Sequence, residues 1–209
     1  MGARTYHQRQ RAQSAEATRQ RIVQAARACL TATPLLAVSL ERIAAQAEVA
    51  RRTIYQIFGS RLGLFEALEH DLLQRGGFAE VQAVFNTNTD ARRILEEVLP
   101  VGVRLLEREQ AILRALYLHA LIDPEAASLT QRLDQGRIGG MRHLAQLLAE
   151  QGYTRPSLTR GEVGDILALL TDFATFDQWR TRLGLTPEEI VQRLRILASS
   201  LLEDHARLA

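Results

Sequence analysis

The sequence contains no lysine, so all 26 of its basic residues are arginines. The planar guanidinium group of arginine binds phosphate and guanine well, and an excess of arginines could indicate a nucleic-acid-binding protein. The bias, however, extends over the whole chain, including its acid-rich part, and genomic base composition explains it better. The absence of lysine is therefore not by itself a sign of DNA binding.

Cysteine is nearly absent too. Cys29 is the single cysteine among 209 residues, which excludes a disulfide within the chain and fits a reducing compartment. Its apolar neighbours have helical spacing, so we interpret Cys29 as a small buried side chain rather than a redox sensor.

Long hydrophobic runs are missing as well. No run approaches the roughly 18 apolar residues that a membrane span needs, and the first residues are too polar for a signal peptide. With 46% hydrophobic and 24% charged residues, the chain can still bury a core in one or two domains. These features predict a cytoplasmic protein without a membrane partner.

The alternation of polar and apolar residues that marks strands does not persist anywhere, whereas apolar residues recur at helical spacing. The sequence therefore predicts an all-α fold. The expected helices cover residues 15–32, 39–47, 51–58, 61–75, 78–86, 90–108, 110–122, 125–151, 160–183 and 187–207.

A change of pattern at Gly76-Gly77 predicts a domain boundary. We expect a flexible basic arm at 1–14, an N-terminal helical domain at 15–75 and a larger helical domain at 77–209. The arm has no apolar periodicity, and it is either solvated or adds contacts with an anionic partner.

Charge is distributed unevenly between these parts. Residues 1–61 contain ten arginines against three acids, and residues 62–209 contain sixteen arginines against twenty-one acids. A positive N-terminal segment on a negative remainder predicts an anionic partner for that segment alone.

The segment ARRTIYQIFGSR, residues 50–61, has two chemically different sides. At 100° per residue, Ile54 and Phe58 lie on one side of the helix and form an apolar face, with Ile57 beside them. The opposite arc of about 140° is polar and comprises Arg51, Arg52, Tyr55 and Gln56. An amphipathic helix at 39–47, joined by a short turn, precedes it, and this is the plan of a helix-turn-helix.

The polar arc has the chemistry that DNA recognition requires. A helix fits the major groove, where Arg binds guanine through two bonds and Gln binds adenine in the same way. We call the expected helix at 51–58 the reading helix. Ser39, Ser60 and Arg61 lie at the starts of the helices before and after it, where hydroxyl and guanidinium groups contact phosphates. We therefore predict a DNA-binding segment.

Residues 38–68, VSLERIAAQAEVARRTIYQIFGSRLGLFEAL, resemble the DNA-binding module of the TetR (tetracycline repressor) family. The resemblance rests on Val38-Ser39, Ile43-Ala44, the turn from Ala47 to Ala50, Tyr55 with Phe58, and Arg61 before a leucine-rich helix. It implies phosphate contacts from Ser39, Tyr55 and Arg61. It also implies base readout from the first turn of the reading helix, with Ala50, Arg51, Arg52, Thr53 and Gln56.

Two departures from the family pattern matter. Glu48 replaces the glycine of the turn and is expected to adopt a left-handed conformation, which costs about 1–2 kcal/mol. Arg61 replaces the usual lysine, which preserves the charge but changes how the side chain reaches and orients.

The resemblance also implies a homodimer that binds a palindromic operator and a small effector that releases it, so that the protein is a repressor. The last two long helices would form the dimer interface, with these apolar candidates: Leu167, Leu170, Phe173, Ala174, Leu194, Leu197, Ala198 and Leu201. The alternative is that this stripe faces its own core. A mostly apolar effector is expected in a pocket lined by Leu99, Val103, Leu106, Leu116, Tyr117, His119, His143, Leu147, Phe173, Phe176 and Trp179.

Three glycines, Gly136, Gly139 and Gly140, interrupt the helical pattern of the larger domain. Each costs about 1 kcal/mol relative to alanine inside a helix. The pattern leaves open a close helix packing, a bend, or a break between two helices.

Two other classes of function remain open at this stage. A metal-dependent enzyme would need ligands such as the i, i+4 pairs His119 with Asp123 and Glu66 with His70. No third ligand, nucleophile motif or phosphate-binding loop accompanies them, so we expect no metal, no cofactor and no catalytic residue. The other class is a helical interaction module without DNA binding, which the acidic Glu48 in the turn keeps open.

Overall fold

The structure is a computed structural model, and it describes residues 2–32 and 38–203. Within these ranges it contains eleven helices and no strand beyond an isolated bridge between Thr154 and Leu202. The predicted all-α fold is confirmed. No helix among the described residues is long and apolar enough to cross a bilayer.

The chain divides into two compact units that do not follow the predicted boundary. The first consists of Met1–Asp71 with Ala115–Thr130, and the second of Leu72–Arg114 with Gln131–Ala209. No local pattern indicates that residues 115–130 belong with the N-terminal helices, because this assignment depends on contacts between residues far apart in the chain.

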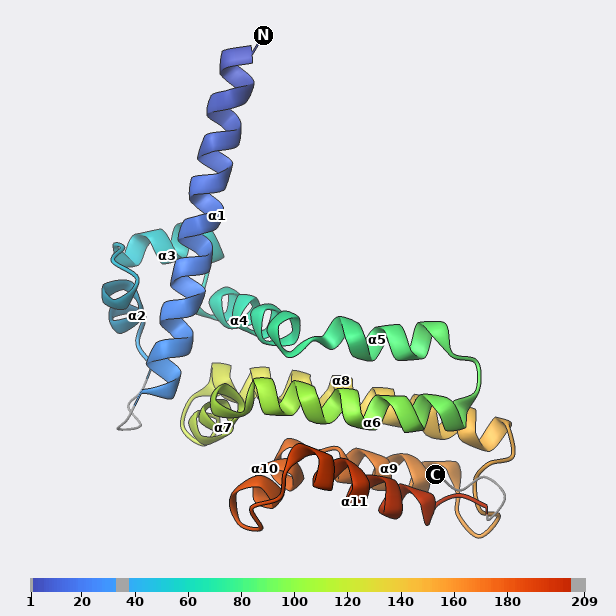
Figure 1. The fold of residues 1–209 in the computed structure, drawn as a ribbon. Coiled ribbons are helices and arrows are strands. Elements are labelled where there is room, and N and C mark those ends of the chain that lie inside the picture. Colours follow the sequence, from blue (N-terminus) through green and yellow to red (C-terminus); the bar gives the residue numbers. More distant parts are fainter. Residues whose placement is uncertain (1, 33–37, 204–209) are drawn as a thin grey trace. The chain divides into compact units, whose positions relative to one another are not determined.

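The first unit is built around four helices, α1 (Gly2–Thr31), α2 (Leu40–Gln46), α3 (Arg51–Phe58) and the first part of α4 (Arg61–Gly76). Figure 1 shows α2 and α3 crossing beside the second half of α1. Their apolar faces form one core whose fully buried side chains include Ile22, Leu30, Ile43, Ile54, Leu64, Phe65 and Leu68.

Helix α1 begins earlier than predicted. It begins at Gly2, so the backbone of residues 2–14, expected as a flexible arm, is helical. The segment lacks an apolar stripe, but its alanine, arginine and glutamine residues are good helix formers that extend the helix begun by the buried residues. The expected stop at Thr33-Pro34 lies outside the described residues.

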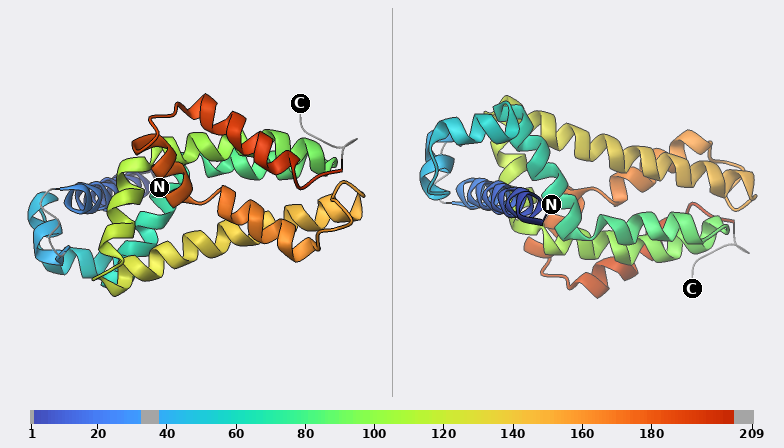
Figure 2. Two further views of the ribbon diagram at one scale, coloured as in Figure 1. Left: turned by 90° about the horizontal axis from the view of Figure 1, so that it is seen from below. Right: turned by 90° about the horizontal axis from the view of Figure 1, so that it is seen from above.

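The second unit contains α5 (Phe78–Thr87), α6 (Ala91–Arg108), most of α8 (Pro124–Glu150), α9 (Arg160–Leu170), α10 (Phe173–Thr181) and α11 (Pro187–Ser199). Helix α6 packs against both α5 and α11. Figure 2 shows α9 running back along α8 after the connecting loop. Helix α7 (Gln110–His119) crosses from the second unit into the first.

Several helix boundaries correct the sequence prediction. The expected helix 160–183 is two helices, because the backbone at Asp172 is extended (φ −68°, ψ 147°) and starts α10. Helix α11 ends at Ser199, and residues 204–207 of the predicted helix lie outside the described ranges. Helix α7 ends at His119 rather than at 122.

The glycines of α8 do not interrupt it. The helix is continuous from Pro124 to Glu150, and a Cβ added at Gly136, Gly139 or Gly140 would meet no atom within 4 Å. Gly164 of α9 is the glycine at a close helix contact, because its Cβ would lie 3.2 Å from the Cα of Arg142. Thus close packing within the described part of the subunit does not account for the three glycines of α8.

Candidate DNA-binding surface

The turn between α2 and α3 sets the direction of the reading helix α3. Ser39 caps α2 by accepting a hydrogen bond from the backbone N–H of Arg42 at 3.2 Å. The backbone N–H of Val49 donates to the carbonyl of Ala44 at 3.0 Å and closes the end of α2. Glu48 has φ 53°, the left-handed conformation that the missing turn glycine predicts.

Helix α3 separates its two faces as predicted. Ile54 is fully buried, with Ile57 and Phe58 half-buried. The guanidinium of Arg19 on α1 lies 4.9 Å from the ring centroid of Phe58 and adds a cation–π contact to this side. Arg51, Arg52, Tyr55 and Gln56 are all exposed. The polar arc of the helix therefore points to solvent within the first unit.

The side chains of the polar arc differ in how they are held. Arg51 donates to the hydroxyl of Tyr55 at 3.1 Å and lies 2.5 Å from a carboxylate oxygen of Glu41 on α2. Within the ranges that the structure describes, Arg52 and Gln56 have no hydrogen bond or ion pair. The arc thus combines one braced arginine with two side chains that are free to bind.

The two serines at helix starts have matching roles. The hydroxyl of Ser60 accepts from the N–H of Gly63 at 3.0 Å in the first turn of α4, just as Ser39 does for α2. An accepting hydroxyl keeps its own O–H donor. Both serines are exposed, so each presents a donor beside α3.

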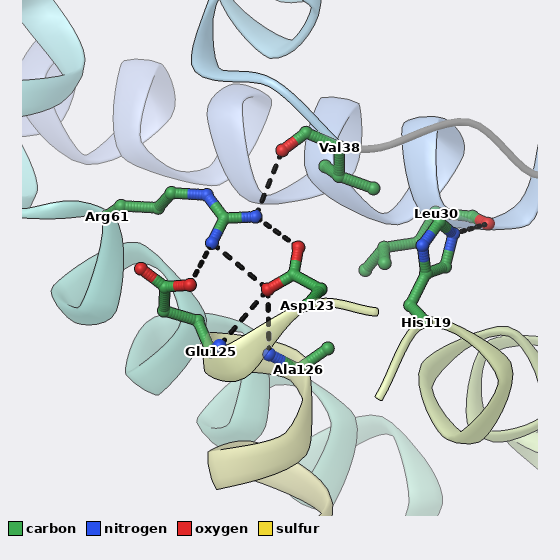
Figure 3. A network of polar contacts seen from close by, with 7 residues as sticks. All are labelled: Leu30, Val38, Arg61, His119, Asp123, Glu125 and Ala126. Carbon is green, nitrogen blue, oxygen red and sulfur yellow. Dashed lines mark hydrogen bonds and ion pairs between the residues drawn. The ribbon is translucent and has the colours of Figure 1, made fainter. Parts of the chain in front are cut away.

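Arg61 is placed differently from the other predicted contacts (Figure 3). Its Nη1 donates to Asp123 Oδ1 at 3.1 Å and to Glu125, and its Nη2 donates to Asp123 Oδ2 and to the carbonyl of Val38 at 3.0 Å. The guanidinium also lies 4.9 Å from the ring centroid of Phe65. Its side chain is only 23% exposed. This group faces protein carboxylates rather than solvent.

Asp123 is the buried partner in this cluster. Burial alone would raise the pKa of its carboxyl, but the hydrogen bond from Arg61 and the backbone N–H groups of Ala126 and Glu125 outweigh burial and lower the pKa. The same contact raises the pKa of Arg61. Both groups are therefore charged at neutral pH.

The pair that could have ligated a metal does not converge on one point. His119 is fully buried and its Nε2 lies 3.2 Å from the carbonyl of Leu30, whereas Asp123 faces Arg61 (Figure 3). The Nδ1 atom of His119 has no hydrogen-bond partner among the described atoms. The part of the chain described here holds no cluster of three metal-ligating side chains.

The predicted effector-pocket residues fall in both units. Leu116, Tyr117 and His119 belong to the first unit and the other eight to the second. His143 is exposed and its ring lies 6.2 Å from that of Phe85. A hollow of about 250 Å³ in the second unit has none of the predicted residues in its lining, which consists of Arg137, Ile138, Arg142, Asp165, Ala168, Leu169 and Asp172.

The apolar interface candidates are mostly core. Leu167, Phe173, Leu194, Ala198 and Leu201 are buried within the second unit, as the alternative reading held. Large apolar side chains are exposed at neighbouring positions that the sequence analysis missed, namely Ile166, Leu169 and Ile196 together with the predicted Leu197. Helical spacing locates an apolar stripe, but it does not tell which edge of a wide stripe faces outward.

Fold and surface together define a class of protein, the helix-turn-helix regulator with a larger helical body. Residues 22–68 match the family described as bacterial regulatory proteins, tetR family, and this confirms the resemblance. The segment belongs to that family, whose regulators bind DNA and control transcription. Among curated proteins, no sequence matches this chain.

Solved structures of regulators share the fold along nearly the whole chain. NalD of Pseudomonas aeruginosa, the secondary repressor of the MexAB-OprM multidrug efflux pump, has a TM-score of 0.71 at 23% identity, covering 92% of this chain and 99% of NalD. A regulator from Saccharomonospora viridis, in complex with choline, has 0.68 at 19%, covering 90% and 99%. The ketosteroid regulator KstR2 of Mycobacterium tuberculosis has 0.61 at 20%, covering 89% and 95%. At these identities the likeness is one of fold.

Proposed function

We propose that this protein is a homodimeric repressor that binds a palindromic operator through α3 and releases it when a small, mostly apolar effector binds. The observation that carries the proposal is the solvent-facing arc of Arg51, Arg52, Tyr55 and Gln56 on a helix whose other face is buried. A helix with this division of faces can enter the major groove without disturbing its own core.

The roles of the individual side chains follow from how each is held. Arg52 and Gln56 are unbound and exposed, so they are the base readers, with guanine and adenine as their preferred partners. Ala50 and Thr53, at the start of the helix, offer methyl groups to thymine. Arg51, braced by Glu41 and Tyr55, reads or steadies the same groove from a fixed position. Ser39, Tyr55 and Ser60 contact phosphates.

The dimer would form through the exposed apolar side chains of α9 and α11. Leu169 is 67% and Ile196 61% exposed, far more than the leucines beside them that pack inward. Contiguous exposed apolar surface on a folded protein is typical of a protein–protein interface. Two reading helices related by a two-fold axis would read half-sites about 34 Å apart or a multiple of that spacing.

The effector site would lie in the second unit among the buried residues Leu99, Val103, Phe173 and Phe176 and the half-buried residues Leu106, Leu147 and Trp179. Their apolar character supports an apolar ligand. An effector that binds better to the dimer unable to hold DNA lowers operator affinity, and DNA lowers effector affinity by the same factor.

The proposal is tested with an electrophoretic shift assay on the DNA upstream of the protein's own gene, across a salt series. We expect palindrome-specific binding that Arg52→Ala and Tyr55→Ala weaken. Weak binding that ignores sequence would instead favour a helical interaction module without operator recognition. The salt series matters because contacts with phosphate weaken steeply as salt rises.

A further inference from the structure

Arg61 has almost no hydrogen-bonding capacity left for DNA. A guanidinium carries five N–H donors, two on each terminal nitrogen and one on Nε. Both donors of Nη1 are used by Asp123 and Glu125, and both donors of Nη2 by Asp123 and the carbonyl of Val38. A phosphate contact through either terminal nitrogen would therefore have to break bonds inside the protein.

The charge around Arg61 also disfavours a phosphate. Two carboxylates, Asp123 and Glu125, face one guanidinium, so the cluster is negative overall. Asp123 is held in place by the backbone N–H groups of Glu125 and Ala126, at 3.1 and 3.2 Å, and cannot turn away without uncapping the start of α8. The anion that Arg61 binds is thus built into the protein.

The cluster holds the reading helix from both sides. Val38 immediately precedes Ser39, the cap of α2, and Arg61 is the first residue of α4, directly after α3. One guanidinium therefore fixes the entry to α2 and the exit from α3 to the same point at the start of α8 (Figure 3). Both ends of the α2–turn–α3 segment are therefore held by contacts of Arg61.

On the basis of the proposed function, we propose that Arg61 is a positioning residue for DNA recognition and not a phosphate contact. Together with Asp123 and Glu125 it sets the orientation of α3, and the arginine at this position replaces the lysine that contacts phosphate in the family pattern. The first turn of α8 thereby becomes a structural part of the DNA-binding unit.

The test is the salt dependence of operator binding by Arg61→Gln compared with the unaltered dimer and with Arg52→Gln. Losing one phosphate contact in each subunit would lower the slope of log K against log salt by about 2. We expect Arg61→Gln to bind about tenfold or more weakly at every salt concentration with an unchanged slope. A slope reduced by about 2 overturns the proposal, and so does unchanged affinity in a folded variant, which would mean a role in stability alone.

A second variant decides the matter if Arg61→Gln does not fold. Glu125→Gln removes one partner of Arg61, and Glu66→Gln, at an exposed position of α4, removes the same charge outside the cluster. Relative to Glu66→Gln, we expect Glu125→Gln to bind operator about threefold more weakly or worse. Tighter binding with a steeper salt slope would show that Glu125 competes with phosphate for Arg61 and would overturn the proposal. If the unaltered protein binds no operator, the proposed function fails instead.

Discussion

At the scale of single residues, Glu48 introduces backbone strain into the turn between α2 and α3. It adopts φ 53° without being glycine, and it puts an acidic group between α2 and the reading helix. The left-handed conformation costs a non-glycine residue about 1–2 kcal/mol. Glycine avoids this cost, but its more flexible unfolded state offsets about 0.5–1 kcal/mol of the stability gained. Glu48→Gly should therefore raise the melting temperature by up to about 4 °C, measured by circular dichroism.

The charge of Glu48 can be separated from its conformation. Glu48→Gln keeps the strained backbone but removes the acid beside DNA, so it should tighten operator binding without raising the melting temperature. Glu48→Gly should do both. If neither variant gains affinity, the side chain of Glu48 lies away from the DNA backbone.

Asp123 gives the first unit an acid-sensitive contact. Burial alone would raise its pKa, but the hydrogen bonds from Arg61 and from the backbone N–H groups of Ala126 and Glu125, with the charge of Arg61, together lower the pKa in the folded state. A depressed carboxyl pKa stabilises the fold fully above the unfolded value near 3.9, and this stabilisation is lost as pH falls through the folded pKa.

Asp123→Asn should thus lower the melting temperature at pH 7 and lose less stability than the unaltered protein as the pH falls below about 4. Thermal melts of both proteins across this pH range measure the difference in melting temperature between them. The contributions of the other carboxyl groups are the same in both proteins and cancel in this difference. If the melting temperatures of the two proteins change with pH in parallel, the titration of Asp123 does not contribute to the pH dependence of stability.

At the scale of elements, helix α8 carries three glycines that no packing contact among the described residues explains. A Cβ at Gly139 meets open space, whereas one at Gly164 of α9 would approach the backbone of Arg142. Gly139→Ala should stabilise the protein by up to about 1 kcal/mol, and Gly164→Ala should destabilise it. Chemical denaturation of the two variants checks both signs, and a loss of stability in Gly139→Ala would reveal a contact made in the proposed dimer.

Elements with a clear local signal could be predicted from the sequence. The two faces of α3 follow from the 100° period, and the cap at Ser39 from its place before an apolar helix start. The break between α9 and α10 was missed, because neither glycine nor proline marks it. Asp172, a common helix-capping residue, was the available signal.

Contacts between distant residues could not be predicted in the same way. Arg61 and Asp123 are 62 positions apart, and nothing in the local pattern of either residue names the other. The prediction of Arg61 as a phosphate contact came from its place at a helix start and from the family position, and neither of these identifies the partners of its charge in this chain.

At the scale of the whole molecule, recognition of a palindrome requires two subunits. The double variant Leu169→Ser with Ile196→Ser removes exposed apolar area from α9 and α11, so we expect it to sediment as a monomer and lose operator affinity. Leu121→Ser is the control, because Leu121 is 81% exposed but lies in the turn after α7. A double variant that stays dimeric would place the interface elsewhere.

The most direct test of the account is selection by the purified protein from a pool of random duplex DNA, followed by sequencing of the bound fragments. We predict an enriched palindrome with two half-sites about one helical turn apart, or a multiple of that spacing. In the same selection, Arg52→Ala should lose the preference at one base pair of each half-site. No enriched sequence with the unaltered protein, or an enriched sequence that Arg52→Ala leaves unchanged, would contradict the claim that the exposed arc of α3 reads DNA.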